Sequence, residues 1–207
     1  MDRQAEGSLP VTAKGRARRE QIIAVATTLF HQQGYHATGI DAIGQAAGIT
    51  GPGVYRHFSG KDEILTTIFD RMWMRLRAGI EVTDGLGDSD ALVALIDHHV
   101  AYAVSCPAEM ALLYRELPHL PIEYQERAGQ NRARYERAWA ARIAGANHGL
   151  ADPVAEMMAR SVFWLINAYA LEGPRLDVGP DEAGSILRSM ALAAALAPLD
   201  PDAGTIV

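Results

Sequence analysis

Apolar residues recur at helical spacing along most of this 207-residue chain, and the alternation of apolar and polar residues typical of strands is scarce. The pattern therefore predicts an all-α fold. Three short helices are expected in the first quarter of the chain, over residues 22–34, 38–48 and 50–58. A long helix is expected to follow from Ser59 to about Val82.

Helix-boundary residues separate the second and third of these helices. Thr38, with Asp41 three residues later, is expected to cap the second helix, and Gly48 is a typical helix stop. Thr50 is then a good N-cap for the third helix, with Pro52 in its first turn, where a missing N–H costs nothing. Two short helices joined by a glycine-containing turn predict a helix-turn-helix, whose second helix enters the DNA major groove.

Spacing alone would equally fit an αα-hairpin that packs on another part of the protein. Residue type favours DNA, because the third helix carries a short run of donors. Its leading end is nearly bare, so its backbone can approach another surface closely. Ser59 with Asp62 predicts a second capping box, whose helix start suits a phosphate. The donors are Tyr55, Arg56, His57 and Lys61, and the bare end is Gly51, Pro52 and Gly53.

At these residues the chain resembles the N-terminal DNA-binding domain of the TetR family of bacterial transcriptional repressors. The resemblance covers roughly residues 17–66 and is densest in the segment FHQQGYHATGIDAIGQAAGITGPGVYRHFSGKDEIL. It implies that backbone phosphates are held by Thr38, Thr50, Tyr55 and Lys61. It also implies that the first residues of the third helix read bases.

The chain departs from many family members at Gly51 and Gly53, which carry no side chain that could read a base. The remaining candidates for base contacts are Arg56, the Thr50 hydroxyl and, through apolar contact, Pro52. We therefore expect more reliance on phosphate positioning and DNA shape than on direct readout.

The formal net charge of −6 is unevenly distributed. Residues 1–62 contain seven Lys or Arg and five Asp or Glu, a balance of +2, which leaves −8 for the remainder. Residues 1–15 are predicted to be a flexible basic arm, although the basic run at Lys14–Glu20 also fits a solvated helix start. A basic end on an acidic body is compatible with DNA binding, because phosphate affinity depends on the local field.

Several function classes are not expected. The single cysteine, Cys106, rules out a disulfide framework or a CxxC metal pair, and we expect no metal site and no cofactor. No apolar run approaches the roughly 20 residues of a membrane span, and no signal-peptide core is visible, so a cytoplasmic protein without membrane contact is expected.

The remainder of the chain predicts a larger helical domain. Five further helices are expected, over residues 91–105, 108–117, 122–146, 152–172 and 180–197, after a loop at 83–90. The predicted domains are the helix-turn-helix domain at 16–60, an effector-binding and dimerisation domain at 61–199, and a flexible tail at 200–207.

The last two helices predict a two-fold homodimer through a four-helix interface, because the first of them is apolar on several sides and the second is rich in small residues. A well-buried core helix in a monomer is the alternative. Two heads would double the contacts on a palindromic DNA site. The candidate interface residues are Met158, Val162, Leu165, Tyr169, Leu187, Met190 and Ala194.

The larger domain also contains many aromatic and Met side chains, which suit a pocket for a small apolar or aromatic effector. Any one of them could instead be an ordinary core residue. The candidate pocket residues are Tyr102, Met110, Leu113, Tyr114, Trp139, Phe163, Trp164 and Asn167.

A dimeric, ligand-responsive regulator, in the first instance a repressor released from its operator by the effector, is the first hypothesis. The rivals are a DNA-binding dimer without an effector, and an all-α enzyme with the first helices as scaffold. The sequence contains no nucleophile elbow, P-loop or zinc motif that would support the enzyme.

Overall fold

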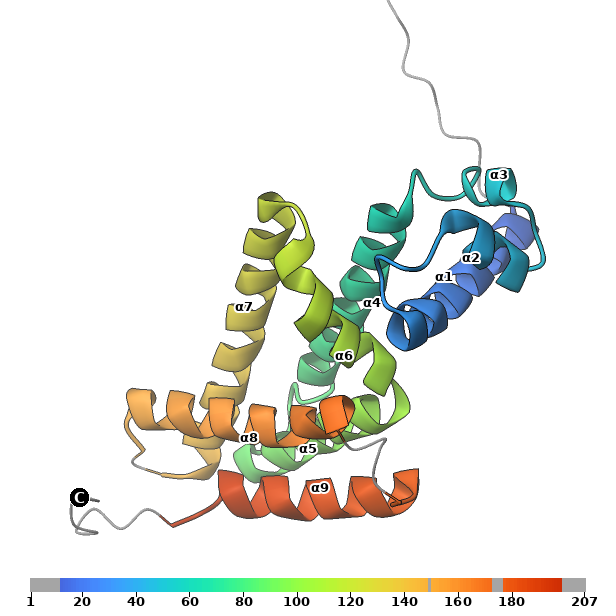
Figure 1. The fold of residues 1–207 in the computed structure, drawn as a ribbon. Coiled ribbons are helices and arrows are strands. Elements are labelled where there is room, and N and C mark those ends of the chain that lie inside the picture. Colours follow the sequence, from blue (N-terminus) through green and yellow to red (C-terminus); the bar gives the residue numbers. More distant parts are fainter. Residues whose placement is uncertain (1–11, 149, 173–176, 199–207) are drawn as a thin grey trace, which may run out of the picture. The chain divides into compact units, whose positions relative to one another are not determined.

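The computed structural model describes residues 12–148, 150–172 and 177–198, and within these ranges it contains helices and no strand (Figure 1). The all-α prediction is confirmed. The elements are α1 (Ala13–Gln33), α2 (Ile40–Ala46), α3 (Gly51–Val54), α4 (Lys61–Glu81), α5 (Asp88–Ser105), α6 (Pro107–Glu116), the 3-10 helix η1 (Leu117–His119), α7 (Ile122–Ala146), α8 (Asp152–Glu172) and α9 (Pro180–Ala195).

The chain forms two compact units that divide between Ile68 and Phe69, inside α4. We call the described residues up to Ile68 the head and those from Phe69 onwards the body. The head packs α1, α2, α3 and the start of α4 around a small apolar core. Its fully buried side chains include Ile22, Phe30, Ile43, Val54, Ile64 and Leu65.

The first helix begins earlier than the sequence predicted. Thr12 caps α1 by accepting a hydrogen bond from Gly15 N at 3.1 Å, so the end of the predicted arm, from Ala13 onwards, is the first turn of a helix. The rest of the predicted arm, residues 1–11, lies outside the described residues, as does the predicted tail at 200–207. Gly34 ends α1 with a φ of 90°, which favours glycine.

Two predicted caps are wrong. Gly39, not Thr38, is the N-cap of α2, because the Thr38 hydroxyl donates instead to the Gly34 carbonyl at 2.8 Å. Glu63, not Asp62, reaches back to the Ser59 N–H at 2.7 Å, and Asp62 instead accepts from the Tyr35 hydroxyl.

The body is a layered helical bundle. α7 packs on α8 and α5, α9 packs on α5 and α8, and α6 packs on α8 (Figure 1). The predicted bounds of α7 and α8 are those observed, whereas α5 begins three residues earlier than predicted, after Gly87 as N-cap.

Among the described residues no single helix meets the length and hydropathy expected of a membrane span. Only the pair 88–105 and 107–119 meets them jointly, and the two halves are bent by 84°.

Candidate nucleic-acid interface and body cavity

The turn between α2 and α3 depends on a close backbone approach at Gly44. A β-carbon on Gly44 would lie 2.9 Å from the Thr50 carbonyl carbon and 3.0 Å from Gly51 N, so any other residue would push α3 away from α2. The turn itself is closed by Gly48, with a φ of 68°, and by a bond from Ile49 N to Gly44 O at 2.9 Å. The sequence analysis did not single out Gly44, although a glycine inside a short helical pattern is a signal for close packing.

Thr50 caps α3 as predicted. Its hydroxyl accepts from Gly53 N at 3.3 Å, and since a hydroxyl also carries one donor, its hydrogen remains available to an incoming oxygen. Pro52 is exposed next to it, whereas Gly51 is buried. A β-carbon on Gly51 would meet the Asp41 carboxylate, so this position faces α2 rather than solvent.

The residues after α3 present the most accessible donors of the predicted set. Tyr55 is 58% exposed and Arg56 is also exposed. His57 is half-buried, and its carbonyl accepts a hydrogen bond from Arg19. The structure therefore brings Thr50, Pro52, Tyr55 and Arg56 together as one short exposed segment.

Two arginines of the predicted basic run are engaged inside the head. Arg18 donates to the Ala47 carbonyl at 2.7 Å, at the end of α2. Arg19 lies 3.8 Å from the centre of the Phe58 ring and 3.2 Å from Glu63. These contacts tie α1 to the helix-turn-helix, so both side chains contribute to its geometry.

Two of the phosphate ligands implied by the family resemblance also have internal partners. Thr38 is buried, and its hydroxyl donates to the Gly34 carbonyl at the end of α1. Lys61 donates to the Tyr35 carbonyl at 2.9 Å and lies 4.7 Å from the Tyr35 ring centre. Both residues therefore support the link between α1 and α2 in this structure.

The Glu63 carboxylate has a lowered pKa. The Ser59 N–H is the main cause of its lowered pKa, and Arg19 adds to the effect, because both stabilise the ionised form. The pair joins the start of α4 to α1.

The body contains a cavity of about 270 Å³ between α4, α6, α7 and α8. Four of the eight predicted pocket residues line it, namely Met110, Leu113, Tyr114 and Phe163. The other residues in its wall are Met72, Trp73, Leu76, Leu117, Pro118, Gln125, Ala128, Gly129 and Arg132.

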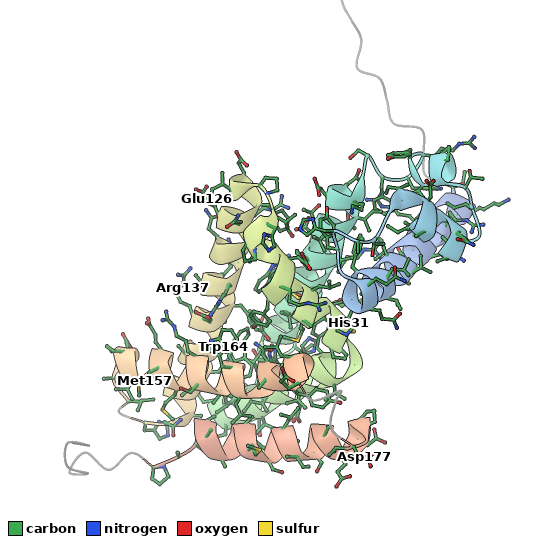
Figure 2. All side chains as sticks on the ribbon, viewed as in Figure 1. His31, Glu126, Arg137, Met157, Trp164 and Asp177 are labelled. Carbon is green, nitrogen blue, oxygen red and sulfur yellow. The ribbon has the colours of Figure 1, made fainter. Side chains whose placement is uncertain are left out.

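The other four predicted pocket residues do not line this cavity. Tyr102 donates to Glu109, and burial raises its pKa. Trp139 is fully buried in the core, and Trp164 is 41% exposed on the outside of α8 (Figure 2). Asn167 lies one hydrogen bond away, behind Tyr114, to which it donates at 2.9 Å.

Asn167 belongs to a buried polar cluster centred on His99. His99 Nε2 lies 3.1 Å from Asn167 Oδ1, and His99 Nδ1 lies 3.2 Å from the Tyr135 hydroxyl. Burial lowers the pKa of His99 to about 4, so the ring is neutral at pH 7. The sequence analysis missed this role, because the partners of His99 are 36 and 68 residues away in the chain.

Three predicted interface residues, Met158, Val162 and Leu187, are buried in the single chain. Leu187 also lines a groove between α8 and α9, and the interface itself stays a prediction. Leu165, Tyr169 and Ala194 are half-buried, and Met190 is 50% exposed. The exposed apolar side chains on these two helices also include Met157, Trp164 and Ile186, the first two of which are labelled in Figure 2.

The head is similar to one family of known proteins. The model of bacterial regulatory proteins of the tetR family matches residues 22–68. The transcriptional activator FasR of Mycolicibacterium smegmatis is 38% identical over 63 residues, which are 30% of this chain and 29% of FasR. The transcriptional repressor KstR2 of Rhodococcus jostii is 32% identical over 107 residues, 50% of this chain and 52% of KstR2.

These matches span about half or less of the length of the curated relatives. A solved structure, AibR in complex with isovaleryl coenzyme A and operator DNA, is similar in fold over 84% of this chain and 97% of AibR, with a TM-score of 0.69 and 18% identity. The named relatives are transcriptional regulators, which supports the expectation of a regulator over an enzyme.

Proposed function

We propose that this chain, which belongs to the TetR family of bacterial regulatory proteins through residues 22–68, is a homodimeric transcriptional regulator that releases a palindromic operator when a small apolar effector binds its body. The observation that carries the DNA-binding part is the exposed segment at Thr50–Arg56, presented by an α2–turn–α3 unit that Gly44 holds tightly together.

In this proposal α3 enters the major groove, and the residues around it divide the work. The Thr50 hydroxyl and the Tyr55 hydroxyl donate to backbone phosphates, which set the position of the helix. Arg56 is the exposed cation of the segment and meets either a phosphate or a base edge. Lys61 and Thr38 act mainly by holding the head in shape.

The homodimer is proposed to form through the outer faces of α8 and α9. A groove of about 290 Å³ runs between these helices and is almost wholly apolar. Its lining includes Leu165, Tyr169 and Ile186, and the exposed Met157, Trp164 and Met190 lie on the same two helices. A two-fold dimer would bury this apolar face against the same face of a second copy. It would also present two heads to a palindromic site.

The effector is proposed to occupy the cavity beside α4, because α4 continues from the body into the head without a break. Met72, Trp73 and Leu76 belong to α4, so a ligand that displaces them would move that helix. The structurally similar AibR was solved with an acyl coenzyme A, which supports an apolar effector for this fold. We propose that the protein is cytoplasmic and that it acts as a repressor.

The test is DNA binding at several salt concentrations, with a fragment from upstream of the chain's own gene. Tyr55→Phe should weaken binding at every sequence, and Arg56→Gln should also lower the slope of log affinity against log salt by about 1. Arg134→Gln is the matched control, since it removes the same charge from an exposed position on α7 of the body. Unchanged affinity for both head variants would refute the proposed interface.

A further inference from the structure

The cavity of the body has an apolar wall with few polar groups, and these are mostly donors. Only Trp73, Tyr114, Gln125 and Arg132 carry polar side-chain atoms among its lining residues. The Gln125 amide N–H groups are engaged by the carbonyls of Leu120 at 2.8 Å and Pro118 at 3.2 Å, so its oxygen is the one acceptor that it offers.

The hydrogen bonds behind Tyr114 have a fixed direction. Asn167 Oδ1 can only accept, so His99 Nε2 carries the ring hydrogen and donates to it. His99 Nδ1 is then an acceptor and takes the Tyr135 hydrogen. Asn167 Nδ2 donates at 2.9 Å to the Tyr114 oxygen.

Tyr114 therefore ends this chain of bonds as an acceptor whose own hydrogen is not taken up by the cluster. Tyr114 is half-buried, and its hydroxyl favours an acceptor because an unmade hydrogen bond is costly in apolar surroundings. Burial also raises the pKa of Tyr114 to about 12, so the hydroxyl keeps its hydrogen at neutral pH. Tyr114 lines the cavity, which is the space where an acceptor would be found.

The other possible donors in the cavity wall are Trp73 and Arg132. The Trp73 indole N–H is buried without a hydrogen-bond partner among the described residues, so it does not reach the open space of the cavity. Arg132 adds positive charge, with its Nε bonded to Glu136 at 2.7 Å and its guanidinium 5.4 Å from the Trp164 ring centre. An arginine carries five N–H donors, so this single bond leaves others for an anion.

We propose that the cavity takes an apolar molecule that ends in a carbonyl acceptor, a carboxylate or an acyl thioester, with the carbonyl oxygen held by the Tyr114 hydroxyl. This deepens the proposed function, on which it rests, by giving the effector a chemical class. The cavity volume of about 270 Å³ corresponds to roughly ten non-hydrogen atoms at the ~30 Å³ that each occupies in a liquid such as water. An eight-carbon acyl group has this size.

Calorimetric titration of the intact protein with octanoate, octanoyl-coenzyme A and octylamine tests the proposal directly. Octanoate or its thioester should bind at one site per chain, at least about tenfold more tightly than octylamine, whose ammonium group can only donate. Binding of the thioester alone would support the proposal and identify the acyl thioester as the source of the carbonyl. Octylamine binding as tightly as either acyl compound would overturn it, and so would the absence of any acyl binding.

Two variants locate the carbonyl. Tyr114→Phe should weaken acyl binding about tenfold, the effect of one lost hydrogen bond to a charged or strongly polar group. Tyr135→Phe is the matched control, because it removes the hydroxyl at the other end of the same chain of bonds, and Tyr135 does not line the cavity. Equal losses in the two variants, or no loss in Tyr114→Phe, would overturn the assignment.

Operator release is measured separately, so that the two proposals fail in different ways. Acyl binding with the expected variant pattern, but unchanged operator affinity, would leave the ligand class standing and remove the regulatory part of the proposed function. If an amine lowers operator affinity and no acyl compound does, the regulatory part of the proposed function would stand and the acyl ligand class would be overturned.

Discussion

The head and the body stabilise their polar groups in opposite ways. In the head, cations are bound by backbone carbonyls and aromatic faces near the surface, as Arg18, Arg19 and Lys61 show. In the body, neutral side chains bond to one another in a fully buried cluster around His99. Exposed ionic contacts are weak and adaptable, whereas a buried neutral network is costly to break.

The difference indicates where each unit is free to interact. The head uses several cations to hold its own helices together, so its DNA contacts are expected to come from the few side chains without such a task. In the body, the hydrogen-bonded cluster lies on one side of the cavity. It ends at Tyr114, whose hydroxyl is left as a donor in the cavity wall.

The largest expected effect comes from breaking the buried cluster. Asn167→Leu would leave the His99 N–H and the Tyr114 oxygen without their partner, at a cost of about 4 kcal/mol in the free energy of unfolding. Urea unfolding followed by tryptophan fluorescence measures it in the body alone, because Trp73, Trp139 and Trp164 all lie there. Ser161→Ala on the exposed side of α8 is the control. A loss below about 1 kcal/mol would mean that the cluster is not a stabilising unit.

Acid should destabilise the body through His99. The folded pKa of about 4 lies below the ordinary histidine pKa of 6.5, so the unfolded chain binds the proton first as the pH falls. The contribution is absent above pH 6.5, grows between pH 6.5 and 4, and amounts to about 3 kcal/mol of lost stability below that window. His98→Gln should keep this pH dependence, and His99→Gln should lose it. Parallel pH profiles for the two variants would contradict the account.

Gly44→Ala should disturb the head and leave the body unchanged. The new methyl group would meet the backbone of Thr50 and Gly51, and such overpacking costs about 2 kcal/mol. Operator affinity and far-UV circular dichroism should both report the loss, while the tryptophan transition stays where it was. Gly60→Ala is the matched control, since its β-carbon would have no neighbour within 4 Å. Equal operator affinity in the two variants would contradict the close α2–α3 packing.

The smallest expected effect is at Glu63. Glu63→Gln weakens the contacts to Ser59 and Arg19, and because this pair is partly exposed the cost should stay below about 1 kcal/mol. The folded pKa of Glu63 is lowered, so its contribution to stability is present above the ordinary glutamate pKa of 4.5 and is lost as the pH falls through the folded pKa. Head stability of variant and wild type should therefore converge at low pH. A difference that persists there would show that the charge is not its cause.

Local signals in the sequence predicted much of the fold. Pro121 and Asn147 bound α7, and Asp152–Pro153 begins α8, so the bounds of these helices were predicted correctly. Thr38 was misassigned because a threonine before a helix reads as a cap, whereas here the carbonyls at the end of α1 take up its hydroxyl. The local sequence pattern does not show which of these two hydrogen bonds the Thr38 hydroxyl makes.

The sites were predicted less completely because they depend on packing between distant helices. The apolar stripes of α8 and α9 were visible in the sequence, but the side of each helix that faces the body was not. The sequence alone therefore did not show that Met158 is buried and Met157 is exposed. Predicting the cavity would have required knowing that α4, α6 and α7 lie together. Predicting the hydrogen bonding of Tyr114 would have required its contact with Asn167, 53 residues away in the chain.

The most direct test of the account is a titration of the protein against the DNA upstream of its own gene and against a scrambled fragment of equal length and composition. The account predicts selective, salt-dependent binding that saturates at two protomers per site. Equal affinity for the two fragments would contradict a sequence-specific regulator, and saturation at one protomer would contradict the proposed dimer.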